Sequence, residues 1–89
     1  MHAVVVRVTI NDREAAEQAL KEEVVPGVSQ APGFVAGYWT GKEGSDQGLS
    51  MVVFESEEAA NAAAERIPST VPEAVTLNDV EVREVVASA

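Results

Sequence analysis

The sequence predicts an α+β fold in which a four-stranded antiparallel sheet carries two helices on one face. Three observations lead to this prediction. Four stretches are rich in β-branched residues, two charged stretches carry alanine at helical spacing, and a repeat relates the two halves of the chain. The chain has 89 residues and no cysteine, so we expect one domain over residues 1–89 without disulfide bonds.

The first half of the chain predicts a strand, a helix and a second strand. Residues 3–10, AVVVRVTI, are mostly β-branched and favour a strand. Apolar positions then recur at helical spacing over residues 12–24, and Asp12 is a good N-cap. Pro26 disfavours helix at the residue before it, so the helix is predicted to end there. Aromatic residues and valine predict the next strand over residues 34–42.

The second half predicts a strand, a helix and a final strand. A turn rich in glycine and serine leads into a strand over residues 49–55, so the second and third strands form a hairpin. Ser56 is an N-cap for a helix that is predicted to end at a loop beginning with Pro68. The last strand is predicted over residues 75–86, with an irregularity at residues 78–79.

An internal repeat supports this order of elements. When the sequence is shifted by 44 positions (52 minus 8), residues 8–22 align with residues 52–66, and valine, glutamate and three alanines coincide. Each half therefore holds a strand, an N-cap signal and a helix face of small residues. Two such halves folded together predict the ferredoxin-like β-α-β-β-α-β plait, with both helices on one face of the sheet.

The predicted strands are apolar on both faces. In the third strand Val52 and Phe54 share one face, while Met51 and Val53 share the other. Two helices cover only one face of the sheet. The second apolar face, which we call the open face, therefore needs another cover, and the simplest one is the open face of a second copy. The residues expected at this dimer interface are Val5, Trp39, Met51 and Val53.

The register of the hairpin decides which aromatic residue faces the helices. If the turn centres near Ser45, Trp39 pairs with Met51 on the open face, and Tyr38 pairs with Val52 on the helix face. A slip of one residue reverses both side chains, because side chains alternate along a strand. In either register, one large aromatic side chain lies on each side of the second strand.

Charge and hydropathy exclude several classes of partner. Fifteen acidic residues against six basic ones give a net charge of -9, which argues against binding to nucleic acid. The apolar runs are too short to span a bilayer and no signal peptide is evident, so we expect a soluble cytoplasmic protein without a membrane partner. We also expect no metal and no cofactor: acidic neighbours such as Glu57 and Glu58 point apart on a helix, and the only histidine is His2, near the terminus.

The chain resembles the dimeric α/β-barrel superfamily, in particular its members similar to antibiotic biosynthesis monooxygenases. The resemblance covers about residues 3–67 and rests on the segments VVVRVTI, VVPGVSQAPGF, GYWTGKEGSDQGLSMVVF and ESEEAANAAAERI. It implies a homodimer in which two four-stranded sheets pack face to face as a barrel. This agrees with the apolar open face inferred from the strands.

The resemblance implies two kinds of chemistry, and the chain departs from one of them. Haem-degrading members use an asparagine in the first strand and a tryptophan and a histidine near the second helix. Here the asparagine position falls near Val6, and residues 59–67 contain neither tryptophan nor histidine, which argues against haem. Cofactor-independent oxygenases of the superfamily use a pocket lined by asparagine, tryptophan, tyrosine and arginine. Residues that supply these types here are Trp39, Tyr38, Arg7, Arg83, Asn61 and Asn78, among others.

Two functional hypotheses follow. The first is a cofactor-independent oxygenase acting on an aromatic or polyketide-like molecule, with Tyr38, Trp39 and Arg7 as candidate catalytic residues. The alternative is a non-catalytic binding or sensor module, in which the two aromatic residues only pack and Arg7 pairs with Glu55 or Glu81. In both hypotheses a small apolar or aromatic ligand lies between sheet and helices. The residues expected to bind it are Tyr38, Phe54, Ala60, Ala64 and Asn78.

Overall fold

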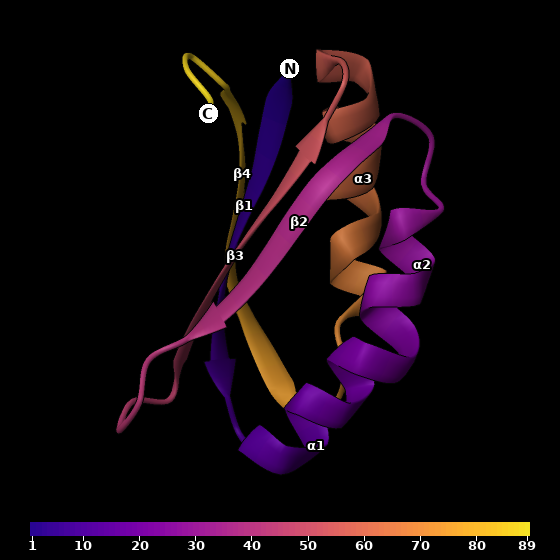
Figure 1. Ribbon diagram of the computed structural model, residues 1–89. Helices are drawn as coiled ribbons and strands as arrows, with labels where there is room; N and C mark the ends of the chain where they lie inside the picture. Colours follow the sequence, from indigo (N-terminus) through magenta and orange to yellow (C-terminus); the bar gives the residue numbers. More distant parts are fainter.

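The chain folds into an antiparallel sheet that carries a layer of helices on one face (Figure 1). The computed structural model describes all of residues 1–89. The elements are β1 (His2–Ile10), α1 (Arg13–Ala19), η1 (Leu20–Val24), α2 (Val25–Ser29), β2 (Phe34–Gly41), β3 (Gln47–Phe54), α3 (Glu57–Thr70) and β4 (Val75–Glu84). The strands lie in the sheet in the order β2-β3-β1-β4, which is the order of a β-α-β-β-α-β plait.

The first helical segment, residues 13–29, is longer than the sequence predicts. It begins as expected at Asp12, whose Oδ1 accepts a hydrogen bond from the backbone N–H of Ala15. The predicted end before Pro26 is wrong, because the helix widens into a π turn (η1) and then continues as α2. At this turn the Val25 N–H donates to the Leu20 carbonyl, five residues earlier. Pro26 thus lies at the start of α2, where its missing N–H breaks little of the helical hydrogen bonding.

The second helix, α3, also continues through a proline. Its start at Ser56 is as predicted: the hydroxyl accepts a hydrogen bond from the Ala59 N–H. The predicted loop at Pro68 is wrong, since this proline lies inside the last turn of α3. The hydroxyls of Ser69 and Thr70 donate to carbonyls three residues earlier in the helix, and these bonds help to hold the final turn.

The hydrophobic core lies between the sheet and the helix layer. Its buried members come from the two central strands and α3, and half-buried residues of both helical segments pack around them. Only nine of the 89 residues are buried in the isolated chain. The buried core cluster consists of Val4, Val6, Val52, Phe54 and Ala60.

The hairpin between β2 and β3 has the alternative register. Tyr38 pairs with Met51, and Trp39 pairs with Ser50, so the prediction that Trp39 pairs with Met51 on the open face is wrong. The turn bends at Gly44, which has a φ of 77°, and its centre lies half a residue earlier than expected. That small change reverses both aromatic side chains: Trp39 faces the helices, and Tyr38 faces away from them.

A bulge in β4 changes which residues face the helices. Val8 pairs with Leu77 while Arg7 pairs with Asp79, which leaves Asn78 as the extra residue opposite β1. The amide of Asn78 donates to the Thr9 hydroxyl at 2.8 Å, on the open face of the sheet. The irregularity expected at residues 78–79 is therefore present.

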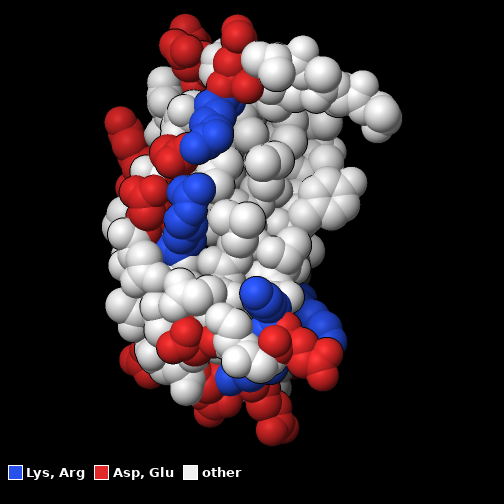
Figure 2. Space-filling model, turned by 90° about the vertical axis from the view of Figure 1, so that its left-hand side faces the viewer, with Lys and Arg blue, Asp and Glu red and all other residues white.

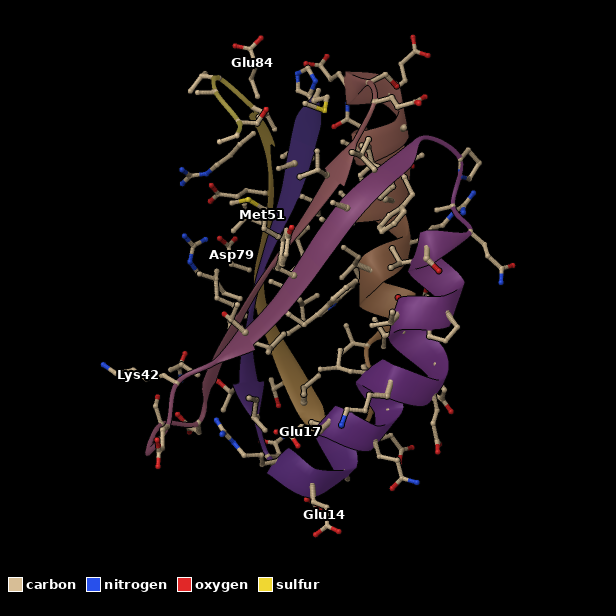
Figure 3. The ribbon with its side chains drawn as sticks, viewed as in Figure 1. Glu14, Glu17, Lys42, Met51, Asp79 and Glu84 are labelled. Atoms are coloured by element: carbon tan, nitrogen blue, oxygen red, sulfur yellow. The ribbon has the colours of Figure 1, made fainter.

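The open face of the sheet, which lies opposite the helices, is uncharged in its middle and charged along one edge (Figure 2). Tyr38 is 67% exposed, Leu49 is 46% exposed and Met51 is 45% exposed. Figure 3 shows that the side chains of Met51 and Asp79 point away from the helix layer. The open face thus presents large apolar side chains that nothing in the chain covers.

Candidate functional site

A cavity of about 750 Å³ lies between the sheet and the helix layer. It is lined by 31 residues, 19 of them hydrophobic, and its volume falls within the range of about 300–1,000 Å³ that is usual for small-molecule sites. The sheet contributes the helix-facing side of β1, β2 and β3, and the opposite wall comes from residues of both helical segments. The cavity is therefore built from the two halves of the chain.

Both walls of the cavity contain small residues. On the sheet, Gly41 and Gly48 face the helices beside Trp39, and neighbouring side chains lie directly over their backbone: a methyl group at Gly41 would lie 3.0 Å from Arg13 Nη2. A methyl group at Gly48 would lie 2.9 Å from Val8 Cγ2, so no larger residue fits without displacing β1 side chains. The helical segments contribute both large apolar residues, such as Leu20, Val28 and Ile67, and small ones to the opposite wall; the small ones are Ala16, Gly27, Ala59, Ala62 and Ala63.

Trp39 is the largest side chain in the cavity. It is half-buried on the helix side of β2 and packs against the core. Phe54 lies farther along the floor, where Phe34 packs against it edge to face with ring centroids 6.3 Å apart. The cavity thus has an indole and a phenyl ring on its sheet side.

Four charged side chains line the cavity, two of each sign. One Arg13 guanidinium nitrogen, Nη2, donates to the Lys42 carbonyl at 3.1 Å, which ties α1 to the end of β2. Neither arginine of the cavity forms an ion pair with a carboxylate. The charged lining residues are Arg13, Glu17, Glu23 and Arg66.

The structure brings only part of the predicted ligand site together. Phe54 lines the cavity, whereas Tyr38 and Asn78 lie on the open face, on the other side of the sheet. Ala60 and Ala64 pack into the core beside the cavity and do not line it. Their helix presents Ala59, Ala62 and Ala63 to the cavity instead.

The three candidate catalytic residues do not meet. Trp39 lies in the cavity, while Tyr38 and Arg7 lie on the open face. Arg7 Nη1 is 3.2 Å from Asp79 Oδ2 and 3.4 Å from Glu81 Oε2. The expected pair with Glu81 is present, and the alternative partner Glu55 is not used. The sheet therefore separates the indole from the phenol and the guanidinium.

Of the residues predicted for the dimer interface, three lie on the open face and one does not. Val5, Met51 and Val53 face away from the helices, as their pairing across β1 and β3 requires. Trp39 points into the cavity, and Tyr38 takes its place on the open face. The one-residue change in hairpin register accounts for this exchange.

Sequence reasoning missed several residues of the cavity. Ser50 lies opposite Trp39 in β3. The sequence gives one signal for it, namely that a polar residue stands at a helix-facing position of an otherwise apolar strand. Gly37 and Gly41 flank Trp39 at intervals of two on the same face of β2, and this small-large-small alternation marks the place where other side chains lie over the backbone: the indole over Gly37 and Arg13 over Gly41. His2, expected at a free terminus, is part of β1, and its Nε2 lies 3.3 Å from Glu57 Oε2.

A charged ladder along β1 and β4 stabilises the edge of the open face. Arg83 donates a hydrogen bond to Glu81, and this bond, with the positive charges of Arg83 and Arg7, holds the pKa of Glu81 below its ordinary value of 4.5. The pKa of Arg83 is raised by the same bond. The ladder consists of Arg7, Asp79, Glu81 and Arg83.

Because the folded-state pKa of Glu81 is depressed, its contribution to stability is present above pH 4.5 and is lost as the pH falls through the folded value. We expect Glu81→Gln to lower the free energy of unfolding at about pH 7 and to make little difference at about pH 3. Urea unfolding at both pH values measures this, with Glu84→Gln as a matched control in the same strand. An equal loss at both pH values would contradict the ion-pair origin.

Comparison with solved structures identifies the fold. A crystal structure of a dimeric ferredoxin-like protein from an uncultured marine organism matches all of this chain and 98% of its own, with a TM-score of 0.62 and 12% sequence identity. The fold is ferredoxin-like. No protein-family model and no curated protein matches the sequence.

None of the helices has the length and apolar character needed to cross a membrane, and no cluster of three or more acidic or histidine side chains is placed to hold a metal ion.

Proposed function

We propose that this protein is a homodimeric binding module that takes one small apolar or aromatic molecule into the cavity of each subunit. The observation that carries the proposal is the apolar cavity of about 750 Å³ between sheet and helices. Its volume falls within the range of about 300–1,000 Å³ that is usual for small-molecule sites, and most of its lining is hydrophobic. The cavity communicates with solvent, so water fills the space when no ligand is bound.

An apolar ligand would gain affinity in this cavity by displacing that water. Water inside a mostly apolar lining finds few hydrogen-bond partners, while each buried CH₂ of a ligand gains about 0.8 kcal/mol. The Trp39 indole and the Phe54 ring supply flat apolar surface on the sheet side. The charged groups would orient a polar end of the ligand rather than supply its main affinity.

The dimer part of the proposal rests on the open face. With nine buried residues, the isolated chain leaves much of its apolar surface in water. Pairing two open faces would bury Tyr38, Leu49 and Met51 in an isologous interface. The similar solved structure is that of a dimeric protein, and the superfamily that the sequence resembles pairs sheets in this way.

Binding without catalysis is the function that the geometry supports best. Of the residues considered for an oxygenase, Trp39 lies in the cavity, but Tyr38 and Arg7 do not. The experiment on binding therefore includes a measurement that separates binding alone from oxygenase turnover.

Native mass spectrometry of freshly purified protein tests the proposal. We expect a dimer that carries a small molecule, released on denaturation, in each of its two subunits. Oxygen uptake with a panel of dihydroxy-aromatic compounds then separates binding from turnover, and we expect no uptake above the rate without protein. A protein that is monomeric and empty, and that binds no member of the panel, would contradict the proposal.

A further inference from the structure

Trp39 and Ser50 form a polar pair in the floor of the cavity. They are direct cross-strand partners in β2 and β3, and both face the helices. The next residue in the same row across the sheet is Val6 of β1, so the pair adjoins an apolar surface. Both side chains are half-buried and both line the cavity.

Neither polar group of this pair is used inside the protein. The indole N–H of Trp39 and the hydroxyl of Ser50 form no hydrogen bond with another residue, and neither atom is sealed from solvent. The neighbouring hydroxyl of Thr40 differs, because it donates to the Leu49 carbonyl at 2.6 Å. The cavity thus offers a ligand one free donor from the indole and one hydroxyl that both donates and accepts.

Gly37 holds the indole in place. It lies two residues before Trp39 on the same face of β2, and a methyl group there would lie 2.7 Å from the indole Cη2 and 2.9 Å from Cζ3. The benzo ring therefore rests on the bare backbone of its own strand. The same methyl group would lie 3.6 Å from Phe34 Cε2, so the Phe34 ring also lies beside Gly37. Any side chain at Gly37 would force the indole to move.

We propose that Trp39 and Ser50 are the specificity-determining residues of the cavity, and that Gly37 is a positioning residue acting through Trp39. The pair selects planar aromatic molecules that carry an oxygen atom on the ring system, such as an aryl ketone or a phenol. The ring stacks on the indole, and the oxygen takes a hydrogen bond from the Ser50 hydroxyl. This inference rests on the proposed binding function and deepens it.

The test compares three probes with nine carbon atoms each. They are 1-indanone, which is planar with a carbonyl; indane, which has the ring system alone; and 2-nonanone, which has the carbonyl on a chain. In isothermal titration of the wild-type dimer, we expect 1-indanone to bind roughly five-fold or more tighter than either of the others. It makes one hydrogen bond that indane cannot make and one aromatic contact that 2-nonanone cannot make. Equal affinities for the three probes would overturn the inference while the binding function stands. Failure of all three to bind would overturn both.

Three variants assign the preference to the residues. Ser50→Ala is expected to reduce the advantage of 1-indanone over indane by about three-fold or more while binding of indane is unchanged. Thr40→Val is the matched control, because the Thr40 hydroxyl is already bonded, and it should leave the advantage intact. Gly37→Ala should shift the fluorescence spectrum of Trp39, the only tryptophan, and lower the affinity for both ring compounds. If Ser50→Ala kept the whole preference for 1-indanone over indane, the inference would be overturned. This outcome does not depend on whether Gly37→Ala folds.

Discussion

Met51→Glu is expected to weaken the proposed dimer by about a thousand-fold or more. Met51 lies in the middle of the open face and is 45% exposed in the isolated chain, so a glutamate there leaves the folded subunit intact. In the paired state the carboxylate would be buried without a partner, which costs roughly 3–5 kcal/mol, and each tenfold change corresponds to about 1.4 kcal/mol. In an isologous interface each subunit contributes one such glutamate, so the dimer carries this cost twice.

Sedimentation velocity over a range of micromolar concentrations measures this effect. Val25→Glu is the matched control, since Val25 is 36% exposed but belongs to α2 on the other side of the molecule. We expect the control to remain dimeric where Met51→Glu is monomeric. A Met51→Glu protein that stays dimeric would show that the open face is not the interface.

Ala63→Phe is expected to block the cavity and lower ligand affinity at least tenfold. Ala63 lies on α3 and lines the cavity, so a phenyl ring there fills space that is open in the wild type. Ala63 also packs against the core, so the apolar burial of about 2 kcal/mol offsets a packing cost of about 1–3 kcal/mol, and we expect the variant to remain folded. The loss of affinity would then come from occupancy of the site and not from unfolding.

The control for this variant lies two residues earlier in the same helix. Asn61 is exposed and does not line the cavity, so Asn61→Phe adds the same ring outside the site. Urea unfolding and titration with 1-indanone give the stability and the affinity of both variants. If both bound like the wild type, the ligand would have to lie elsewhere.

Much of the fold could be predicted from the sequence because its signals are local. The N-caps Asp12 and Ser56 begin their helices as predicted, and the β-branched stretches are strands. The two predicted helix ends failed for a different reason. Pro26 and Pro68 are tolerated by a π turn and by hydroxyl groups that bond the last carbonyls, and neither device follows from the rule about proline alone.

The candidate site was harder to predict because it depends on register and on the placement of the helix layer. The direction of Trp39 and Tyr38 depends on a half-residue change at Gly44, which the composition of the turn does not specify. In β4, the bulge at Asn78 lets apolar residues on either side of it face the helices, although simple alternation would divide them between two faces. The cavity itself depends on how the helix layer is placed over the sheet, and a pattern of apolar residues does not reveal such a space.

The proposal that each chain binds one small apolar or aromatic molecule between sheet and helices is tested most directly by isothermal titration of the wild-type protein with 1-indanone. This experiment gives the number of sites as well as the affinity. We expect saturable binding of one molecule per chain, with the fluorescence of Trp39 changing in proportion to occupancy. Heat that does not saturate, or saturation that leaves the Trp39 fluorescence unchanged, would contradict it.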